Sequence, residues 1–497
     1  MLLVVADVVA FVVLVVPLRG RGRWLRYAAL GPLMVTGVQL LVEGPRWQMV
    51  PAYALGVLFF LVWLLKAIRP AGRPGGRRWV RRLAVGLGVL GLALAGALPT
   101  VFPVFGFPHP DGPYQIGTVT YHWVDRGRHE IFSADPAARR ELMAQVWYPV
   151  MGSSSSARAP YMPDAHAFSA AVTRGLSAAG QVRLPGFVFD HFRYVTTHAI
   201  PSAPVATDKP RYPVLIFLTG IGGFRQSNTF QVEELVSHGY IVVGLDQPYA
   251  AVTVGFPDGR RITGLTRDRL QPLIDQSTSP AEPAPTLNGK ALEHGAVPYL
   301  TQDVGFALDQ LAALDAADPH GGLTGRLDLQ RVGTFGISLG AIVAGEGCHT
   351  EPRLKACLMM DAAMPADVVP AGLRQPSMWI TRNAETMRLE QRHGGGWPES
   401  AIHEAQTSMR AVYAKSPPGH GYFVQVPGMF HPNFTDAPYW TPLAYQMGLG
   451  GPIDAQRGFD IVNAYSVAFF GQELLGHPTA LLSGPSRQYP EVTFETH

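Results

Sequence analysis

The 497-residue sequence has few cysteines and no pattern typical of a protein metal site. Its two cysteines, Cys348 and Cys357, are too few for a disulfide framework. They form either one bridge in an exported domain or two buried thiols; the sequence does not decide between these, although we favour the thiols. Because no HExxH, CxxC or EF-hand pattern occurs, we expect no metal or other cofactor.

Most of the chain also lacks an excess of basic residues. The formal net charge is +3, but residues 1–105 alone carry twelve Lys or Arg against two acids. Residues 106–497 hold 28 basic and 35 acidic side chains, which makes this larger part acidic. A nucleic-acid-binding protein needs a basic surface on its globular part, so we expect no nucleic-acid partner.

Long apolar stretches characterise the basic N-terminal part. They cover residues 2–18, 28–42, 49–65 and 83–105. Because a spanning helix needs about 20 apolar residues, residues 1–105 are predicted to form a transmembrane region of about four helices. The alternative is a signal peptide followed by buried helices, but no basic segment precedes the first stretch.

The basic residues between these stretches predict an orientation. They gather at 19–26 and 66–82, whereas the loop between the second and third stretches has only Arg46. Since cytoplasmic loops are enriched in Lys and Arg, the chain after residue 105 is expected on the outer, periplasmic face. We therefore expect a multi-pass plasma-membrane protein that has the lipid bilayer as a partner.

The rest of the chain alternates short apolar runs with segments of helical spacing. Strands are predicted at 118–124, 142–150, 214–218, 241–246, 331–337, 354–361, 376–381 and 422–428. Helices are predicted at 228–240, 299–317, 339–347, 403–416 and 458–475. This alternation predicts an α/β fold, with a mainly parallel sheet between two layers of helices.

Domain boundaries follow from composition. A Pro/Gly-rich linker at 106–117 precedes a domain at 118–480, which contains an irregular insert at about 161–210. A long proline-containing loop is expected at 255–297, and residues 481–497 are expected to form a C-terminal tail.

A candidate nucleophile lies in the run Gly336-Ile337-Ser338-Leu339-Gly340, which follows a predicted strand and opens a helix. This context is the one that a nucleophile elbow requires, and its glycines permit a tight, strained turn. The Leu339 amide then points to where an oxyanion forms. With 54 glycines in the chain, the alternative is a glycine-rich turn that contains a serine by chance.

A serine nucleophile needs a base and an acid, which follow it in the chain at strand ends in this kind of fold. Asp361 ends the strand 354–361 and is the predicted acid, with Asp367 as the alternative. His431 follows the strand 422–428 and is the predicted base. The other candidate histidines lie at less suitable positions: His349, His403 and His420.

A second oxyanion donor is expected from the loop at 218–228, which follows an early strand and contains three glycines within five residues. The Ile221 amide is the best candidate there. The alternative is a flexible connection between a strand and a helix.

Several motifs in a fixed order carry a resemblance to a known family. The runs PVLIFLTGIGGFRQSN, GISLGA, MMDAAMP and FHPNFTD resemble the platelet-activating factor acetylhydrolase family (plasma, isoform II type) of α/β-hydrolases, over about residues 115–475. The resemblance implies Ser338 as nucleophile, Asp361 as acid and His431 as base, with the amides of Ile221 and Leu339 as the oxyanion hole.

The same resemblance implies a metal-independent esterase whose substrates carry short or oxidised acyl chains. Thr219 and Ile337 stand where histidines are common in the family, which leaves the backbone roles intact. We therefore expect a membrane-anchored serine esterase acting on small-molecule or lipid esters. The alternatives are an acyltransferase, a peptidase or a polyesterase on this fold, or a membrane transport or signalling protein with a ligand-binding hydrolase-like domain.

Overall fold

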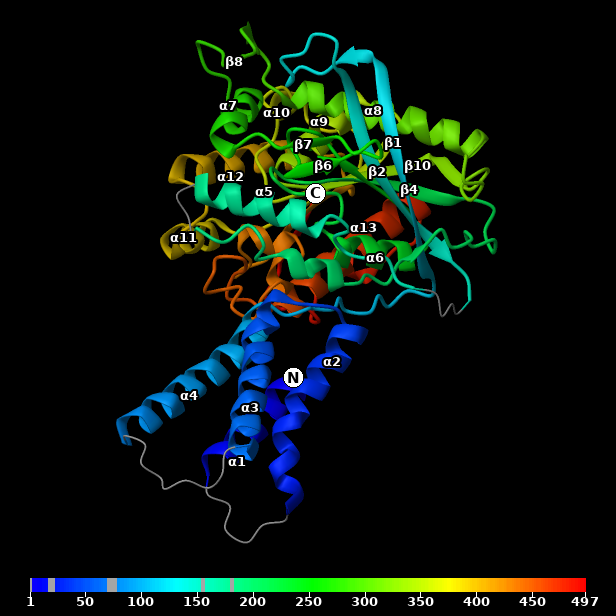
Figure 1. Cartoon of the computed structure of the whole chain (residues 1–497). Helices are drawn as coiled ribbons and strands as arrows, with labels where there is room; N and C mark the ends of the chain where they lie inside the picture. The colour runs from blue at the N-terminus through cyan, green and yellow to red at the C-terminus, as the bar shows by residue number, and fades with distance from the viewer. Residues whose placement is uncertain (1, 17–22, 69–77, 153–156, 179–182) are drawn as a thin grey trace. The chain divides into compact units, whose positions relative to one another are not determined.

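The computed structural model describes residues 2–16, 23–68, 78–152, 157–178 and 183–497. The chain divides into two units, Met1–Phe105 with Trp440–Leu443 and Gly106–Tyr439 with Ala444–His497. Figure 1 draws both units in one colour scale from the N-terminus to the C-terminus. Segments 17–22 and 69–77 hold part of the basic residues that predict the orientation, and they lie outside the described residues.

The first unit is helical. Its elements are α1 (Leu2–Val15), η1 (Arg23–Leu30), α2 (Gly31–Val42), η2 (Trp47–Met49), α3 (Val50–Ile68) and α4 (Arg78–Val101). Two segments are long and apolar enough to cross a membrane, Trp47–Ile68 and Arg78–Val101. The other two predicted spans correspond to the shorter apolar helices Leu2–Val15 and Tyr27–Val42. Among the described residues, only these two helices are candidate spans, so the expected region of about four transmembrane helices is not supported.

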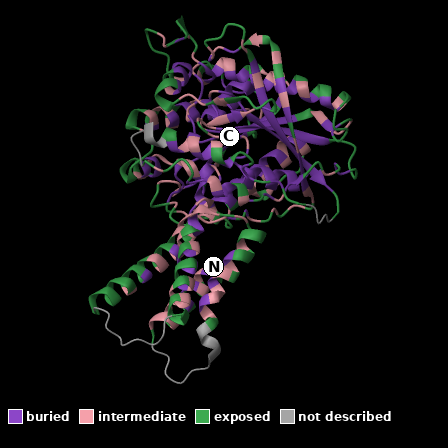
Figure 2. Ribbon diagram, in the orientation of Figure 1, coloured by how far each residue is buried: buried purple, intermediate pink, exposed green. Residues whose placement is uncertain are grey.

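A small apolar core joins these helices, yet much of their apolar surface faces outward. Leu3, Ala52 and Phe59 are buried in the core. Leu41 and Met34 are 89% and 71% exposed, and Figure 2 colours long stretches of these helices as exposed.

The second unit is built on a sheet that has ten strands among the described residues, in the order β14-β13-β12-β11-β10-β4-β5-β2-β1-β3. Their bounds are β1 (Gln115–His129), β2 (Arg139–Val150), β3 (Ile200–Pro201), β4 (Tyr212–Leu218), β5 (Ile241–Asp246), β10 (Leu327–Ile337), β11 (Leu354–Met360), β12 (Ser377–Thr381), β13 (Gly421–Gln425) and β14 (Thr493–Thr496). The six neighbours from β5 to β13 run parallel. The strand pairs β1–β2, β2–β5 and β13–β14 are antiparallel.

Burial on both faces explains why the sequences of the central strands are continuous apolar runs. Every residue of β4 and of β5 is buried, as expected for parallel strands covered on both faces. The purple strands at the centre of Figure 2 show this burial. The predicted α/β class and mainly parallel sheet are therefore confirmed.

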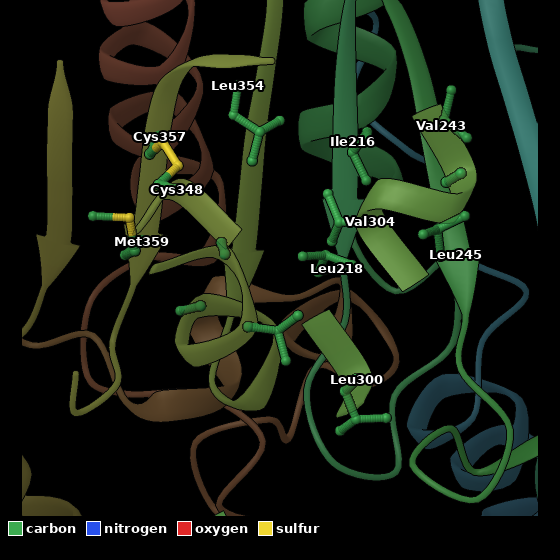
Figure 3. Packing of buried hydrophobic residues seen from close by; sticks show 14 of the residues in the cluster. Ile216, Leu218, Val243, Leu245, Leu300, Val304, Cys348, Leu354, Cys357 and Met359 are labelled. Carbon is green, nitrogen blue, oxygen red and sulfur yellow. A yellow bond between two sulfur atoms is a disulfide. The ribbon is translucent and has the colours of Figure 1, made fainter. Parts of the chain in front are cut away.

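Helices cover both faces of the sheet. One apolar layer joins the strands to α8 (Val297–Ala316), α9 (Leu339–Thr350) and α12 (Glu399–Tyr413). In Figure 3, Val304 of α8 lies beside Ile216 and Leu218 of β4 within this layer. The opposite layer contains residues of α6 (Thr229–Ser237) and α13 (Ala455–Leu475). Because all parallel strands end at one edge between these layers, the residues after them can converge there.

Some connections contain more structure than their sequences indicate. The predicted loop 255–297 includes α7 (Arg267–Thr278) and the short strands β7 (Arg261–Thr263), β8 (Thr286–Leu287) and β9 (Lys290–Ala291), after β6 (Thr253–Gly255). The insert contains α5 (Ala165–Ala178), η3 (Asp190–Tyr194) and β3. Two further short helices follow β11 and β12, α10 (Val368–Ala371) and α11 (Ala384–His393). The short 3-10 helix η6 (Ala480–Leu482) follows α13. The segment expected as a tail then contains β14, which pairs with β13 at the edge of the sheet.

The two cysteines form a disulfide, contrary to the preference for free thiols. Cys348 in α9 is bonded to Cys357 in β11, with Cα atoms 6.5 Å apart. Figure 3 shows this bond in yellow inside the apolar layer. The sequence could not decide the pairing, because it depends on how α9 packs against the neighbouring strand.

Candidate active site

Ser338 occupies the sharp turn between β10 and α9. Its backbone has φ 57° and ψ −125°, a conformation that is costly for a residue with a side chain. Gly340 makes the turn possible, because a Cβ there would collide with the carbonyl oxygen of Leu218 on β4. Gly336 has the same constraint against the backbone of Gly340. Both glycines of the motif therefore have a steric role, and they leave Ser338 only partly buried at the strand end.

Asp361 directly follows β11 and is fully buried, with φ 48°. Its carboxylate accepts hydrogen bonds from Thr381 Oγ1 at 2.9 Å, Arg382 Nε at 2.9 Å and His431 Nδ1 at 2.6 Å. Burial opposes ionisation, but the Arg382 charge and these hydrogen bonds outweigh it and hold the pKa of Asp361 below its ordinary value. Asp361 is therefore a buried carboxylate in contact with a histidine.

His431 begins the short turn η4 (His431–Phe434), six residues after β13 ends. Its side chain is 25% exposed, so part of the ring remains accessible while Nδ1 is engaged by Asp361. Burial lowers the pKa of His431, and the charges of Arg382 and Arg267 act in the same direction, against the opposing effect of Asp361. A neutral imidazole held by a carboxylate at Nδ1 has Nε2 available as a proton acceptor.

The alternative residues lie elsewhere. Asp367 caps α10 by accepting the amide proton of Val368 at 3.0 Å. His420 pairs with Glu473 at 2.8 Å, before β13 begins. His403 and His349 are exposed residues of α12 and α9. Of the candidate acids and histidines, the structure thus brings Asp361 and His431 together.

The candidate oxyanion loop lies against the serine. A Cβ built on Gly220 would come within 3.0 Å of Ser338 Cβ. The amides of Gly222 and Gly223 donate to the carbonyls of Ala250 and Gly220, which is why Ile221 is the better candidate donor. Leu339 is the first residue of α9, where backbone amides point out of the helix end.

Sequence reasoning missed three residues behind His431. Arg382 directly follows β12, and its buried guanidinium also pairs with Glu390 of α11. The ring of Trp397 lies 4.8 Å from the Arg382 guanidinium carbon and 5.1 Å from the His431 ring. The rule that site residues follow strands could have identified Arg382, whereas Glu390 and Trp397 have no such signal.

Comparisons with known proteins agree with an esterase. Residues 100–256 match the family model for platelet-activating factor acetylhydrolase, isoform II. A probable 1-alkyl-2-acetylglycerophosphocholine esterase of Arthroderma benhamiae is 25% identical over 81% of this chain and 96% of its own. Platelet-activating factor acetylhydrolase of Canis lupus familiaris is 25% identical, and the match covers 57% of this chain and 62% of that protein.

A solved structure of an esterase also has a similar fold. The structure of a ferulic acid esterase from Streptomyces cinnamoneus matches with a TM-score of 0.59 and 27% identity, over 79% of this chain and 99% of its own. By these matches the chain is similar to proteins of the platelet-activating factor acetylhydrolase family. They confirm the predicted enzyme class, a carboxylic ester hydrolase.

Proposed function

We propose that this protein is a membrane-anchored serine esterase with Ser338 as nucleophile, His431 as base and Asp361 as the orienting acid. The observation that carries the proposal is the 2.6 Å contact between His431 Nδ1 and Asp361 Oδ2. These two residues and Ser338 all follow parallel strands of one sheet. The Asp361–His431 pair supplies the base and the orienting acid that activation of a serine for acyl transfer requires.

The chemistry follows from these roles. His431 Nε2 takes the proton of Ser338 Oγ as the oxygen attacks the acyl carbon, and the carbonyl electrons move to its oxygen. The amides of Ile221 and Leu339 donate hydrogen bonds to that oxyanion. When the intermediate collapses, His431 protonates the leaving alkoxide and an acyl-enzyme remains. Water then repeats the sequence, which releases the carboxylic acid and restores Ser338.

The substrate class is an acyl ester with a short acyl chain, either a phospholipid or a smaller ester. The Arthroderma benhamiae relative is named for a 1-alkyl-2-acetylglycerophosphocholine, the canine relative for platelet-activating factor, and the structural relative for ferulic acid. What these names share is a carboxylic ester. The substrate class is therefore tested with a series of esters and phospholipids in which acyl length and head group are varied independently.

The first unit is the proposed anchor. Two of its helices have the length and composition of membrane spans, and large apolar side chains are exposed along them. The disulfide Cys348–Cys357 supports an outer-face location for the second unit, because such bonds persist in oxidising compartments.

The nucleophile is tested with Ser338→Ala. This variant should lose turnover of p-nitrophenyl acetate and butyrate, and should no longer be labelled by a fluorophosphonate probe, because the reacting oxygen is gone. The matched control is Ser483→Ala, which removes an exposed hydroxyl outside the site and should behave as the wild type. Full labelling of the Ser338→Ala protein would refute the assignment.

A further inference from the structure

A second ion pair lies directly behind the proposed acid. Arg382 Nε donates to the same Asp361 oxygen that contacts His431, and the other end of its guanidinium pairs with Glu390. The Asp361 and Arg382 side chains are 0% exposed and that of Glu390 is 7% exposed. Trp397 covers the guanidinium face. The Glu390 carboxylate also accepts the backbone amide of His431 at 3.3 Å.

The charges of this cluster have a specific consequence for His431. A lone Arg382 would neutralise Asp361 and weaken the stabilisation of the imidazolium that forms during catalysis. Glu390 compensates the arginine, so two carboxylates and one guanidinium leave a net charge of −1 behind the ring. Because the cluster is buried, water screens these interactions little.

A purely structural ion pair would not need this arrangement. Buried pairs contribute little net stability, since removing two charges from water offsets their attraction. The chain contains a comparison, the buried Arg140 with Asp303 and Glu130, in which one arginine also lies between two carboxylates. Here Asp303 pairs with a second arginine, Arg128, as well. None of the contacts described for Arg140 reaches a candidate catalytic residue. The cluster behind His431 differs in sharing its carboxylate oxygen with the proposed base.

We propose that Arg382 and Glu390 are positioning residues of the active site, which hold Asp361 ionised and aligned while keeping a single negative charge behind His431. The inference rests on the proposed function, since it assigns roles through Asp361 and His431. It predicts that the two residues shift the pKa of His431 in opposite directions, Arg382 lowering it and Glu390 raising it.

The test is the acid limb of the pH profile of kcat/KM, which reports the proposed base in the free enzyme. The charged groups facing His431 are Asp361, Arg382 just after β12, Glu390 of α11 and Arg267 of α7. In the wild type, burial places the midpoint below the ordinary histidine value of about 6.5.

Removing either charge should move that midpoint. Arg382→Met leaves two carboxylates near the ring, so the midpoint should rise by about one pH unit. Glu390→Gln leaves the arginine uncompensated, so the midpoint should fall by a comparable amount. The double variant restores a net charge of −1 and should return to the wild-type midpoint, although kcat falls in all three because alignment is lost.

The matched control is Arg140→Met, which removes a buried arginine of similar surroundings and should leave the midpoint unchanged even if stability falls. If Arg382→Met does not fold, Arg382→Lys replaces it. The lysine keeps the charge, so its midpoint should stay while kcat decreases, and Glu390→Gln should still lower the midpoint.

Fluorophosphonate labelling separates the two proposals. If Ser338 is the labelled residue and the midpoints of the Arg382 and Glu390 variants all stay within about 0.2 pH unit of the wild type, the positioning role is refuted. If Ser338→Ala is still labelled, the proposed triad itself fails. Shifts of the same sign in Arg382→Met and Glu390→Gln would also overturn the charge compensation.

Discussion

Gly340 has room for a hydrogen atom and nothing larger. A Cβ at this position would collide with the carbonyl oxygen of Leu218 and lie 2.8 Å from that of Thr219. Both groups are backbone of the segment that leads into the candidate oxyanion loop, so they cannot move away without disturbing the site. The glycine therefore sets how closely the start of α9 approaches β4.

We predict that Gly340→Ala lowers the free energy of unfolding by about 2–3 kcal/mol and lowers kcat, because the turn carrying Ser338 must shift. The control is Gly175→Ala in α5, where an added Cβ meets nothing within 4 Å. That change should stabilise by about 0.5–1 kcal/mol, since alanine favours a helix. Urea denaturation and ester turnover measure both effects, and similar behaviour of the two variants would contradict the steric argument.

At the scale of elements, the disulfide joins α9, which begins directly after Ser338, to β11, which ends directly before Asp361. Cys348 and Cys357 are nine positions apart in the sequence, and both are buried in one apolar layer. The bond therefore fixes α9 against β11, which are the two elements that present the proposed nucleophile and acid.

We predict that Cys348→Ala with Cys357→Ala lowers the free energy of unfolding by about 2–3 kcal/mol, because a short loop is no longer closed in the unfolded chain. Guanidinium denaturation should show the same loss when the wild type is treated with a reductant, whereas the double variant should not respond to the reductant. Two titratable thiols in the denatured, unreduced wild type would show that the bond is not formed.

Central strands that were predicted from the sequence are buried along their whole length, whereas elements that were missed have few buried residues or contain a proline. β4 and β5 are buried along their whole length and read as apolar runs. α11 has only three buried residues, and α7 contains Pro272, so neither gives a strong helical pattern. β14 has a single buried residue, and its strand state comes from pairing with β13.

At the scale of the whole molecule, the boundary between the two units coincides with the end of the apolar N-terminal region, at Phe105 and Gly106. The second unit contains the entire ten-stranded sheet and every candidate site residue. The proposed chemistry therefore needs only that unit, whereas the proposed anchoring needs only the first.

We predict that a chain of residues 106–497 stays in the soluble fraction. It should hydrolyse p-nitrophenyl butyrate with a kcat within about twofold of the full chain, because every candidate site residue lies in the second unit. A twofold change corresponds to about 0.4 kcal/mol in activation free energy. The full chain should sediment with membranes and be released by detergent, because its two long apolar helices bind lipid. Full-length protein that remains soluble without detergent would contradict the proposed anchor.

The sequence alone determined the features that depend on local sterics and burial. These are the buried strands, the Gly-x-Ser-x-Gly turn at Ser338, and the location of Asp361 and His431 after later strands. Only the tertiary structure decided which distant side chains meet. The Asp361–His431 contact spans 70 positions, and Arg382, Glu390 and the disulfide partners meet because of how separate helices pack on the sheet. Such contacts depend on the relative orientation of whole elements, which no local pattern of residues encodes.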